Sequence, residues 1–112
     1  MFPENLVLGA TIESNRPYRM SRAPTPFDRY RSMAGLQYRN KLISIEPIMD
    51  FDLDILVGWL KDIDPTIVYV GYDNYNNGLP EPSLAKTIEL VSKLEDFTQV
   101  SPKTIREANQ IH

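Results

Sequence analysis

Residues 39–51 read RNKLISIEPIMDF, a segment with the signs of a buried β-strand that is interrupted by polar residues and ended by Pro47. Its aliphatic and β-branched residues predict a strand at 42–48. Ser44 and Glu46 stand inside that strand, although glutamate is almost never fully buried without a partner. Two interpretations follow: one face of the strand is exposed to solvent, or the strand ends at a binding site that contains Glu46.

Further strands and helices alternate around this segment. Such alternation predicts parallel strands joined by right-handed crossovers, and therefore a single α/β domain over residues 1–112 with a sheet of about four strands. In the helix at 83–96, the spacing of Leu84, Ile88, Val91 and Leu94 predicts one buried stripe. The predicted strands are 6–13, 42–48, 66–73 and 97–100. The first predicted helix begins at Thr25 or Pro26 and ends near 36, the second begins at Asp52 or Asp54 and ends at 64, and the others are 83–96 and 101–110.

Side chains along the predicted strands alternate between two faces of the sheet. One face is aliphatic, and the other becomes polar toward the carboxyl ends of the strands. On the strand at 42–48, Ile43 shares a face with Ile45, and Ser44 shares the opposite face with Glu46. Glu13, Glu46 and Asp73 lie at or near the ends of three successive strands, in the same phase. Parallel neighbours are about 4.8 Å apart, so we expect these carboxylates to converge where parallel sheets bind ligands.

Composition limits the classes of function. The chain has 112 residues, of which 42% are hydrophobic and 24% charged, which indicates a globular protein with one core. A net charge of −3 is too small to indicate a strongly charged partner. Arginine and lysine do gather between residues 16 and 41. A solvated surface is the ordinary interpretation of such a run, and contact with phosphate, nucleotide or nucleic acid is the alternative.

The sequence contains no cysteine, which excludes a disulfide, a thiolate nucleophile and cysteine ligands for zinc or an iron–sulfur cluster. Its apolar runs are shorter than the roughly 20 residues that span a bilayer, and the first residues lack the pattern of a signal peptide. We therefore expect a cytoplasmic protein without a membrane partner.

Other candidate site residues are fewer. Carboxylates alone would suit Mg²⁺ or Mn²⁺, but without a nearby histidine the pattern is weak, and no metal is predicted. The only histidine, His112, is the last residue. Lys103 and Arg106 stand at the start of the predicted last helix, where an anion can bind a helix N-terminus. Tyr69, Tyr72 and Tyr75 either stack on an adenine or fill the end of the third strand.

Three segments, LVLGATIESNR, RNKLISIEPI and TIVYVGYDN, resemble the C-terminal half of the radical-SAM-like family of uncharacterised phage and prokaryotic proteins. Members of that family have a strand ending in Val-Glu-Asn, a strand reading Ser-hydrophobic-Glu-Pro, and a strand ending in Gly-Gly-Glu. The resemblance covers about residues 4–107, and ISIEP at 43–47 is its most specific element. Gly71-Tyr72-Asp73 departs from the third motif.

The resemblance implies a sheet like half of a TIM barrel, with S-adenosylmethionine bound across the strand ends. Glu13, Ser14 and Asn15 match the region that approaches the ribose, and Glu46 and Asp73 match positions that line the cavity. The expected cofactor-binding residues are Glu13, Ser14, Asn15, Ser44, Glu46, Asp73 and Lys103.

The same resemblance identifies what this sequence lacks. Radical SAM enzymes hold a four-iron cluster through three cysteines in the N-terminal half of the barrel, and this chain has none. We therefore expect a fragment or remnant that binds S-adenosylmethionine or a related nucleoside but is not catalytically competent alone. The expected partner is a second copy or a separate N-terminal half-barrel. The alternative is a non-enzymatic interaction module that uses its open sheet face or edges to dimerise or dock.

Overall fold

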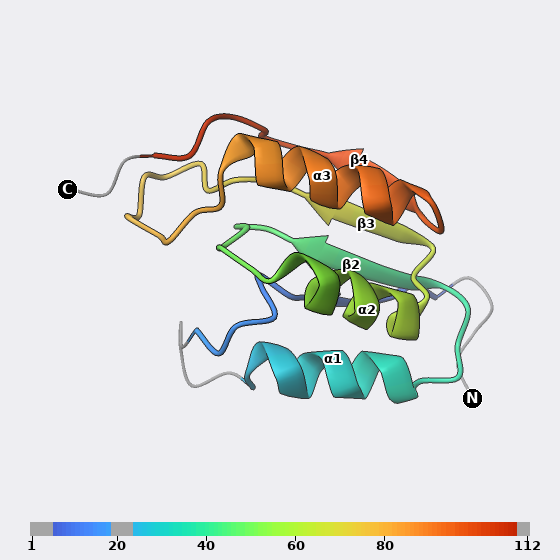
Figure 1. Cartoon of the computed structure of the whole chain (residues 1–112). Helices are drawn as coiled ribbons and strands as arrows, with labels where there is room; N and C mark the ends of the chain where they lie inside the picture. Colours follow the sequence, from blue (N-terminus) through green and yellow to red (C-terminus); the bar gives the residue numbers. More distant parts are fainter. Residues whose placement is uncertain (1–5, 19–23, 110–112) are drawn as a thin grey trace.

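The computed structural model describes residues 6–18 and 24–109, in which strands and helices alternate along the chain (Figure 1). This order confirms the predicted alternation and three of the four predicted helices. The elements are β1 (Leu8–Thr11), α1 (Pro26–Gly35), β2 (Lys41–Ile45), α2 (Leu53–Ile63), β3 (Ile67–Val70), α3 (Leu84–Glu95) and β4 (Gln99–Pro102).

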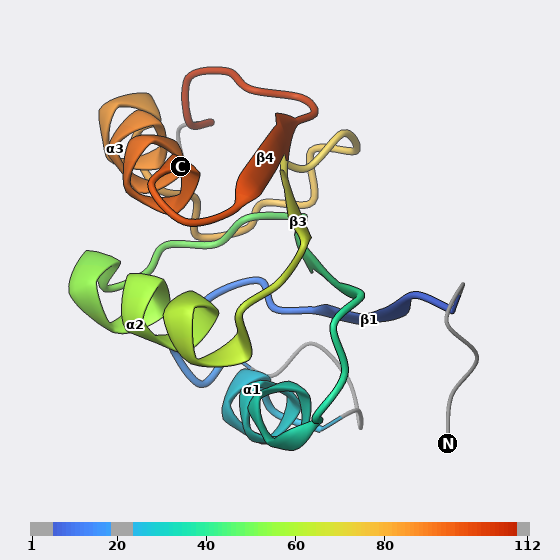
Figure 2. The same ribbon diagram turned by 90° about the vertical axis from the view of Figure 1, so that its right-hand side faces the viewer.

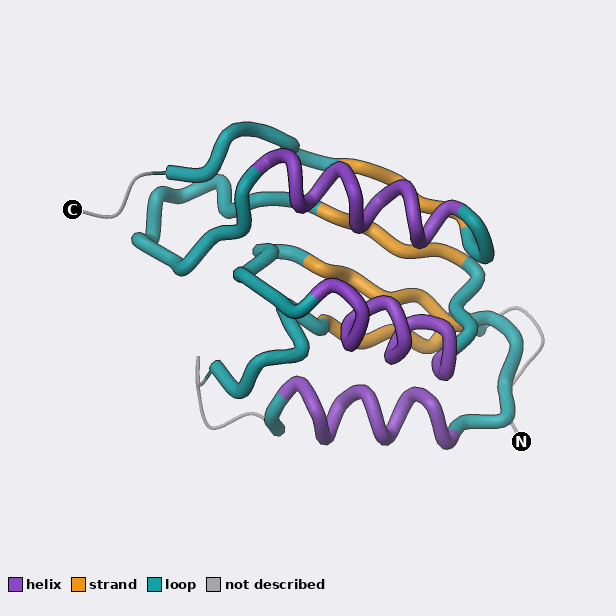
Figure 3. Tube along the Cα trace, viewed as in Figure 1, coloured by secondary structure: helices purple, strands orange, loops and turns teal. Residues whose placement is uncertain are grey.

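The strands form one parallel sheet in the order β1-β2-β3-β4, which confirms the α/β prediction. The register pairs Ala10 with Ile43, Ile43 with Val68, and Val68 with Val100. All three crossover helices lie on the same side of the sheet (Figure 2). The opposite side, called the open face here, carries no helix from the described residues. Long loops gather at the carboxyl ends of the strands, and short connections lie at the other end (Figure 3).

Two helices begin where the sequence predicts, because a hydroxyl is available at each N-cap. The side chains of Thr25 and Ser83 accept hydrogen bonds from the amides of Asp28 (3.2 Å) and Lys86 (3.2 Å). The helix α2 ends at Asp64, which adopts a left-handed conformation with φ of 55° just before Pro65. Local side-chain chemistry therefore places these boundaries within a residue or two of the predicted ones.

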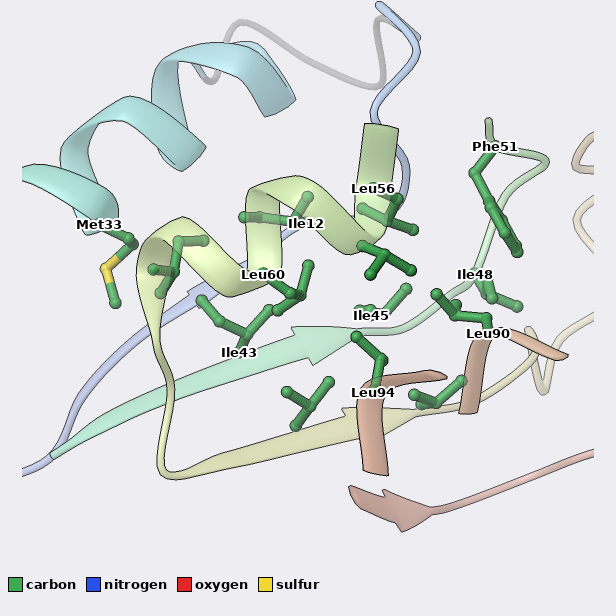
Figure 4. Packing of buried hydrophobic residues seen from close by; sticks show 14 of the residues in the cluster. Ile12, Met33, Ile43, Ile45, Ile48, Phe51, Leu56, Leu60, Leu90 and Leu94 are labelled. Atoms are coloured by element: carbon green, nitrogen blue, oxygen red, sulfur yellow. The ribbon is translucent and has the colours of Figure 1, made fainter. Parts of the chain in front are cut away.

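The core fills the space between the sheet and the helices (Figure 4). Ile43, Ile45, Val68 and Val70 are fully buried on this side, and the burial of Ile43 and Ile45 confirms the predicted phase of β2. Burying each such side chain contributes about 1.5–3 kcal/mol. Their partners from the helices and loops include Met33, Ile48, Phe51, Leu56, Val57, Leu60, Ile63, Leu90 and Leu94.

The predicted stripe on α3 is partly wrong. Thr87, Leu90 and Leu94 are its buried residues, whereas Ile88 is 56% exposed. The hydroxyl of Thr87 forms a 2.7 Å hydrogen bond with that of Tyr72, so a polar residue can take a core position. Apolar spacing alone indicated the more hydrophobic Ile88 and missed Thr87.

Lys41 links the first residue of β2 to the ends of two helices. Its Nζ donates hydrogen bonds to the carbonyls of Met33 (2.8 Å) in α1 and Ile63 (3.0 Å) in α2. The last carbonyls of a helix lack intrahelical donors and carry partial negative charge, so an ammonium group suits this position. Burial lowers the pKa of Lys41, and the charge of Asp64 opposes that shift. Sequence reasoning did not identify this contact.

The fourth strand lies two residues later than predicted. The amides of Phe97 and Thr98 still donate to the carbonyl of Leu94, at 3.1 and 3.0 Å, so these residues complete the end of α3. Pairing with β3 begins only at Gln99 and includes Pro102. As the outer strand of the sheet, β4 can accommodate proline, because one side of its backbone has no neighbour that needs a donor.

The prediction of a last helix at 101–110 is wrong for the residues that the structure describes. Residues 103–109 contain no helix. Instead they continue along β3: the amide of Lys103 donates to the carbonyl of Val70 (2.8 Å), and the amide of Tyr72 donates to the carbonyl of Thr104 (2.7 Å). Ser101 and Pro102 have the composition of a helix start, but pairing with a neighbouring strand satisfies the same backbone groups.

None of the helices in residues 6–18 and 24–109 has the length and apolar character needed to cross a membrane.

Candidate functional site

Glu13 forms a structural ion pair. Its two carboxylate oxygens accept hydrogen bonds from Arg29 of α1, Oε1 from Nη1 at 3.1 Å and Oε2 from Nη2 at 2.9 Å. Nη1 of Arg29 also donates to the carbonyl of Thr11. The regular strand ends at Thr11, so strand phase no longer fixes where the Glu13 side chain points. The contact ties the end of β1 to α1.

Asp73 shapes the loop after β3. Its carboxylate accepts hydrogen bonds from the amides of Tyr75 (3.1 Å) and Asn77 (2.7 Å), and from the side-chain amide of Asn77 (3.0 Å). The backbone amide of Asn77 is the main cause of the lowered pKa of Asp73. Asn76 and Gly78 have φ of 53° and 68°, in agreement with the turn.

The convergence of Glu13, Glu46 and Asp73 on one ligand stays a prediction, and two of the three carboxylates are engaged within the protein. Glu13 and Asp73 each have a separate set of hydrogen-bond donors, and β1 and β3 end before reaching them. Across residues 6–18 and 24–109, no group of three or more His, Cys, Asp or Glu side chains could hold a metal ion.

Ser14 and Asn15 join the loop after β1 to the loop after β2. The buried hydroxyl of Ser14 donates to the carbonyl of Asp50 (2.6 Å) and accepts from the amide of Arg16 (3.0 Å). The Asn15 side chain accepts from the amide of Asp52 (2.7 Å) and donates to its carboxylate (2.9 Å). Both side chains therefore have a structural role at the positions that the resemblance assigns to the ribose.

Ion pairs strengthen the same junction. Arg16 contacts Asp50 and Asp52, each at 3.0 Å, and Lys86 of α3 contacts Asp50 at 2.7 Å. Burial raises the pKa of Asp50, but the hydrogen bond from Lys86 and the neighbouring charges outweigh burial, so the net direction is downward. Because its carboxylate is engaged by Arg16 and Asn15, the N-cap residue Asp52 makes no side-chain cap hydrogen bond.

Glu46 differs from the other two carboxylates. Strand pairing continues past β2 and β3, because the amide of Gly71 donates to the carbonyl of Ile45 (3.1 Å). This pairing sets Glu46, Gly71 and Lys103 side by side at the carboxyl ends of β2, β3 and β4. A Cβ atom added at Gly71 would lie 2.9 Å from Oε2 of Glu46 and 3.0 Å from Cβ of Lys103. The Glu46 carboxylate therefore occupies the space above Gly71.

Tyr69 completes this group on the open face. It lies in β3 between Ser44 of β2 and Ser101 of β4 in the register. Nζ of Lys103 lies 4.6 Å from the centre of the Tyr69 ring, a cation–π contact. The open-face cluster is defined as Ser44, Glu46, Tyr69, Gly71 and Lys103.

The polar groups of the open-face cluster are available to a ligand. Within the described ranges, the Ser44 hydroxyl and the Glu46 carboxylate make no hydrogen bond, and Glu46 and Lys103 make no ion pair. Glu46 is half-buried and Lys103 is exposed. A carboxylate, an ammonium group, a hydroxyl and an aromatic ring thus share one surface, where they can bind a small polar ligand.

The remaining residues that the sequence suggested as ligand contacts lie outside the open-face cluster. Tyr72 is fully buried, and its hydroxyl donates to the carbonyl of Pro82 at 3.0 Å. Tyr75 is 83% exposed. Arg106 does not stand at a helix N-terminus, because residues 103–109 form no helix. Of the three tyrosines, only Tyr69 belongs to the open-face cluster.

Arg106 and Glu81 form an ion pair that sequence reasoning missed. The Arg106 guanidinium donates to both Glu81 oxygens, at 2.9 and 2.7 Å, and to the carbonyl of Asp73 at 2.9 Å. The Glu81 side chain is 2% exposed, and the hydrogen bonds from Arg106 are the main cause of its lowered pKa. The sequence shows only a glutamate between Pro80 and Pro82, and its burial, which requires a charged partner, is known from the structure alone.

No known protein family, curated protein or solved structure matches this chain. The resemblance to the radical-SAM-like family therefore depends on the three strand-end motifs, and it stays a prediction.

The same change from glutamate to glutamine at Glu46 and at Glu13 should distinguish a carboxylate without a partner from a paired one, by its effect on stability. Glu46→Gln should change the free energy of unfolding by less than about 0.5 kcal/mol, because it removes no ion pair. Glu13→Gln should lower it by about 1–3 kcal/mol, because the bidentate contact with Arg29 is lost. Urea denaturation at pH 7 measures both. A loss of more than 1 kcal/mol for Glu46→Gln would show that this carboxylate is a structural group.

Glu81→Gln should lower stability in a pH-dependent way. The folded pKa of Glu81 lies below its ordinary value of 4.5, so ionised Glu81 stabilises the fold above that value. This contribution is lost as pH falls through the folded pKa. At pH 7 the variant should be less stable by about 2–4 kcal/mol, and the difference from the wild type should shrink below pH 4.5.

Urea denaturation across this pH range measures the difference, and Glu89→Gln on the exposed side of α3 is the control. A difference between wild type and Glu81→Gln that stays constant down to pH 2 would contradict the assignment of the ion pair.

Proposed function

We propose that this chain is a portion of a radical-SAM-like enzyme that binds S-adenosylmethionine or a related nucleoside at the carboxyl ends of its strands. The open-face cluster supplies the contacts, with Ser44, Glu46 and Lys103 as the polar groups. Because the chain has no cysteine, it holds no ligands for an iron–sulfur cluster, and radical chemistry would require a cluster held elsewhere.

The observation that carries the proposal is the free carboxylate of Glu46 at a strand end. Ligands of parallel α/β sheets bind outside the carboxyl ends of the strands. At this edge, Glu13, Ser14, Asn15 and Asp73 already have hydrogen-bond partners from the protein. Glu46 has none within the described residues, so a ligand can bind it without breaking a structural contact.

Titration calorimetry of the purified chain with S-adenosylmethionine tests this proposal. We expect saturable binding that Glu46→Ala weakens at least about tenfold, the effect of removing one hydrogen bond to a charged group. Glu89→Ala, on the exposed side of α3, is the matched control and should bind as the wild type does. Binding that Glu46→Ala leaves unchanged, or a wild-type chain that does not bind, would contradict the proposal.

A second candidate function is a non-enzymatic interaction module, and the uncovered sheet favours it. All-parallel sheets occur almost only where both faces are covered, and here helices cover one face. The open face also carries the half-buried side chains of Leu42 and Ile67, and within residues 6–18 and 24–109 the outer strands β1 and β4 each have one edge without a neighbouring strand. A second copy that packs on the open face would bury the side chains of Leu42 and Ile67.

Sedimentation over a range of concentrations tests this candidate. The wild-type chain should dimerise. Leu42→Glu should shift it to monomer, because the dimer interface on the open face would then bury an unpaired charge. Ile55→Glu is the control, since Ile55 is 50% exposed on α2 in the helix layer. A wild-type chain that stays monomeric, or equal effects of both variants, would rule out a dimer through the open face.

A further inference from the structure

An apolar groove, called the α3 groove here, lies between α3 and the end of β4 with the segment that follows it. Its volume is about 390 Å³, which is enough for a large apolar side chain. Ile88 is 56% exposed in it, although isoleucine is among the residues most often buried. The apolar residues of the lining are Ile88, Val91, Pro102 and Ile105.

Glu95 is the charged residue in the lining of the α3 groove. It follows Val91 by four residues, so it lies one turn farther along the same side of α3. Within residues 6–18 and 24–109 its carboxylate makes no hydrogen bond or ion pair. Glu95 is also the last residue of α3, where the helix dipole disfavours a negative charge. The groove therefore suits a partner that has an apolar side chain and, one turn away, a positive charge.

The exposed side of α1 carries this combination. Phe27 is 49% exposed, and Arg31, four residues later, is exposed. The Arg31 guanidinium lies 5.8 Å from the centre of the Phe27 ring, and in the described ranges it makes no ion pair. The rings of Tyr30 and Trp59 support Phe27, each at 5.9 Å between centres. Aromatic residues and arginine are enriched in the centres of protein interfaces.

We infer that α1 of one copy of this chain binds the α3 groove of a second copy. Phe27 packs against Ile88 and Val91, and Arg31 pairs with Glu95. Four residues span about 6 Å in each helix, so both contacts form together when the two helices run parallel. The inference goes beyond the proposed function, because it concerns the helix layer and not the strand ends.

The contact joins two different surfaces, so it can be blocked on either one. Phe27→Glu blocks α1 and leaves the groove intact, whereas Ile88→Glu blocks the groove and leaves α1 intact. Each variant alone should stay monomeric in sedimentation experiments. A mixture of the two should form a dimer with one copy of each, and its association constant should be at least about tenfold higher than for either variant alone.

Both variants also carry Leu42→Glu, so that a dimer through the open face does not contribute. A contact between one helix and one groove is small, and we therefore expect it at higher protein concentrations than a dimer that covers the open face. Circular dichroism shows whether each variant folds.

Reversal of the two charges tests the pairing of Arg31 with Glu95, in the same Leu42→Glu background. Arg31→Glu and Glu95→Arg should each weaken self-association at least about tenfold, because like charges would face each other. The double variant Arg31→Glu/Glu95→Arg should restore it. Glu89→Arg, on the side of α3 toward α2, is the control and should have no effect. These exposed positions keep the test valid if Phe27→Glu does not fold.

A mixture of folded variants that stays monomeric would overturn the inference. A double variant that associates no better than the two single charge variants would also overturn it. Titration with S-adenosylmethionine measures binding at Glu46 separately, so the inference and the proposed function can fail independently.

Discussion

A parallel sheet has to bury its side chains, and in this protein three helices do so on one face only. The covered face contains the core, in which Ile43, Ile45, Val68 and Val70 pack against the helices. Lys41 holds the ends of α1 and α2 against the start of β2 through two carbonyl groups. On the open face, the polar side chains of the open-face cluster lie near the carboxyl ends of the strands, where the long loops also lie.

Most charged groups at those ends stabilise the loops. Arg16 connects the loops after β1 and β2, Arg29 fixes Glu13, and Arg106 fixes Glu81 and the segment after β4. Once these partners are assigned, Glu46 and Lys103 stand apart as charges that do not pair with each other in the described ranges. A site built on a rigid sheet and surrounded by stabilised loops is preorganised, which lowers the entropic cost of binding a ligand.

The predictions that succeeded depended on local chemistry. The hydroxyl groups of Thr25 and Ser83 cap the helices that follow them, and alternation within 42–46 fixes which side chains share a face. The prediction of the last helix failed because it assumed that a local pattern continues to the end of the segment. In the structure, residues after β4 pair with the segment after β3, and Arg106 binds Glu81.

The sequence by itself determined the alternation of strands and helices, the parallel sheet and the position of Glu46 on the face opposite Ile45. Propensity, capping and strand periodicity act between residues close in the chain, so they can be read from it. Only the tertiary structure decided which carboxylates are paired. Glu13 meets Arg29 and Asp73 meets Asn77, while Glu46 comes to lie over Gly71 beside Lys103. Most of these contacts join elements far apart in the sequence, and an ion pair depends on distances of a few ångströms that folding alone sets.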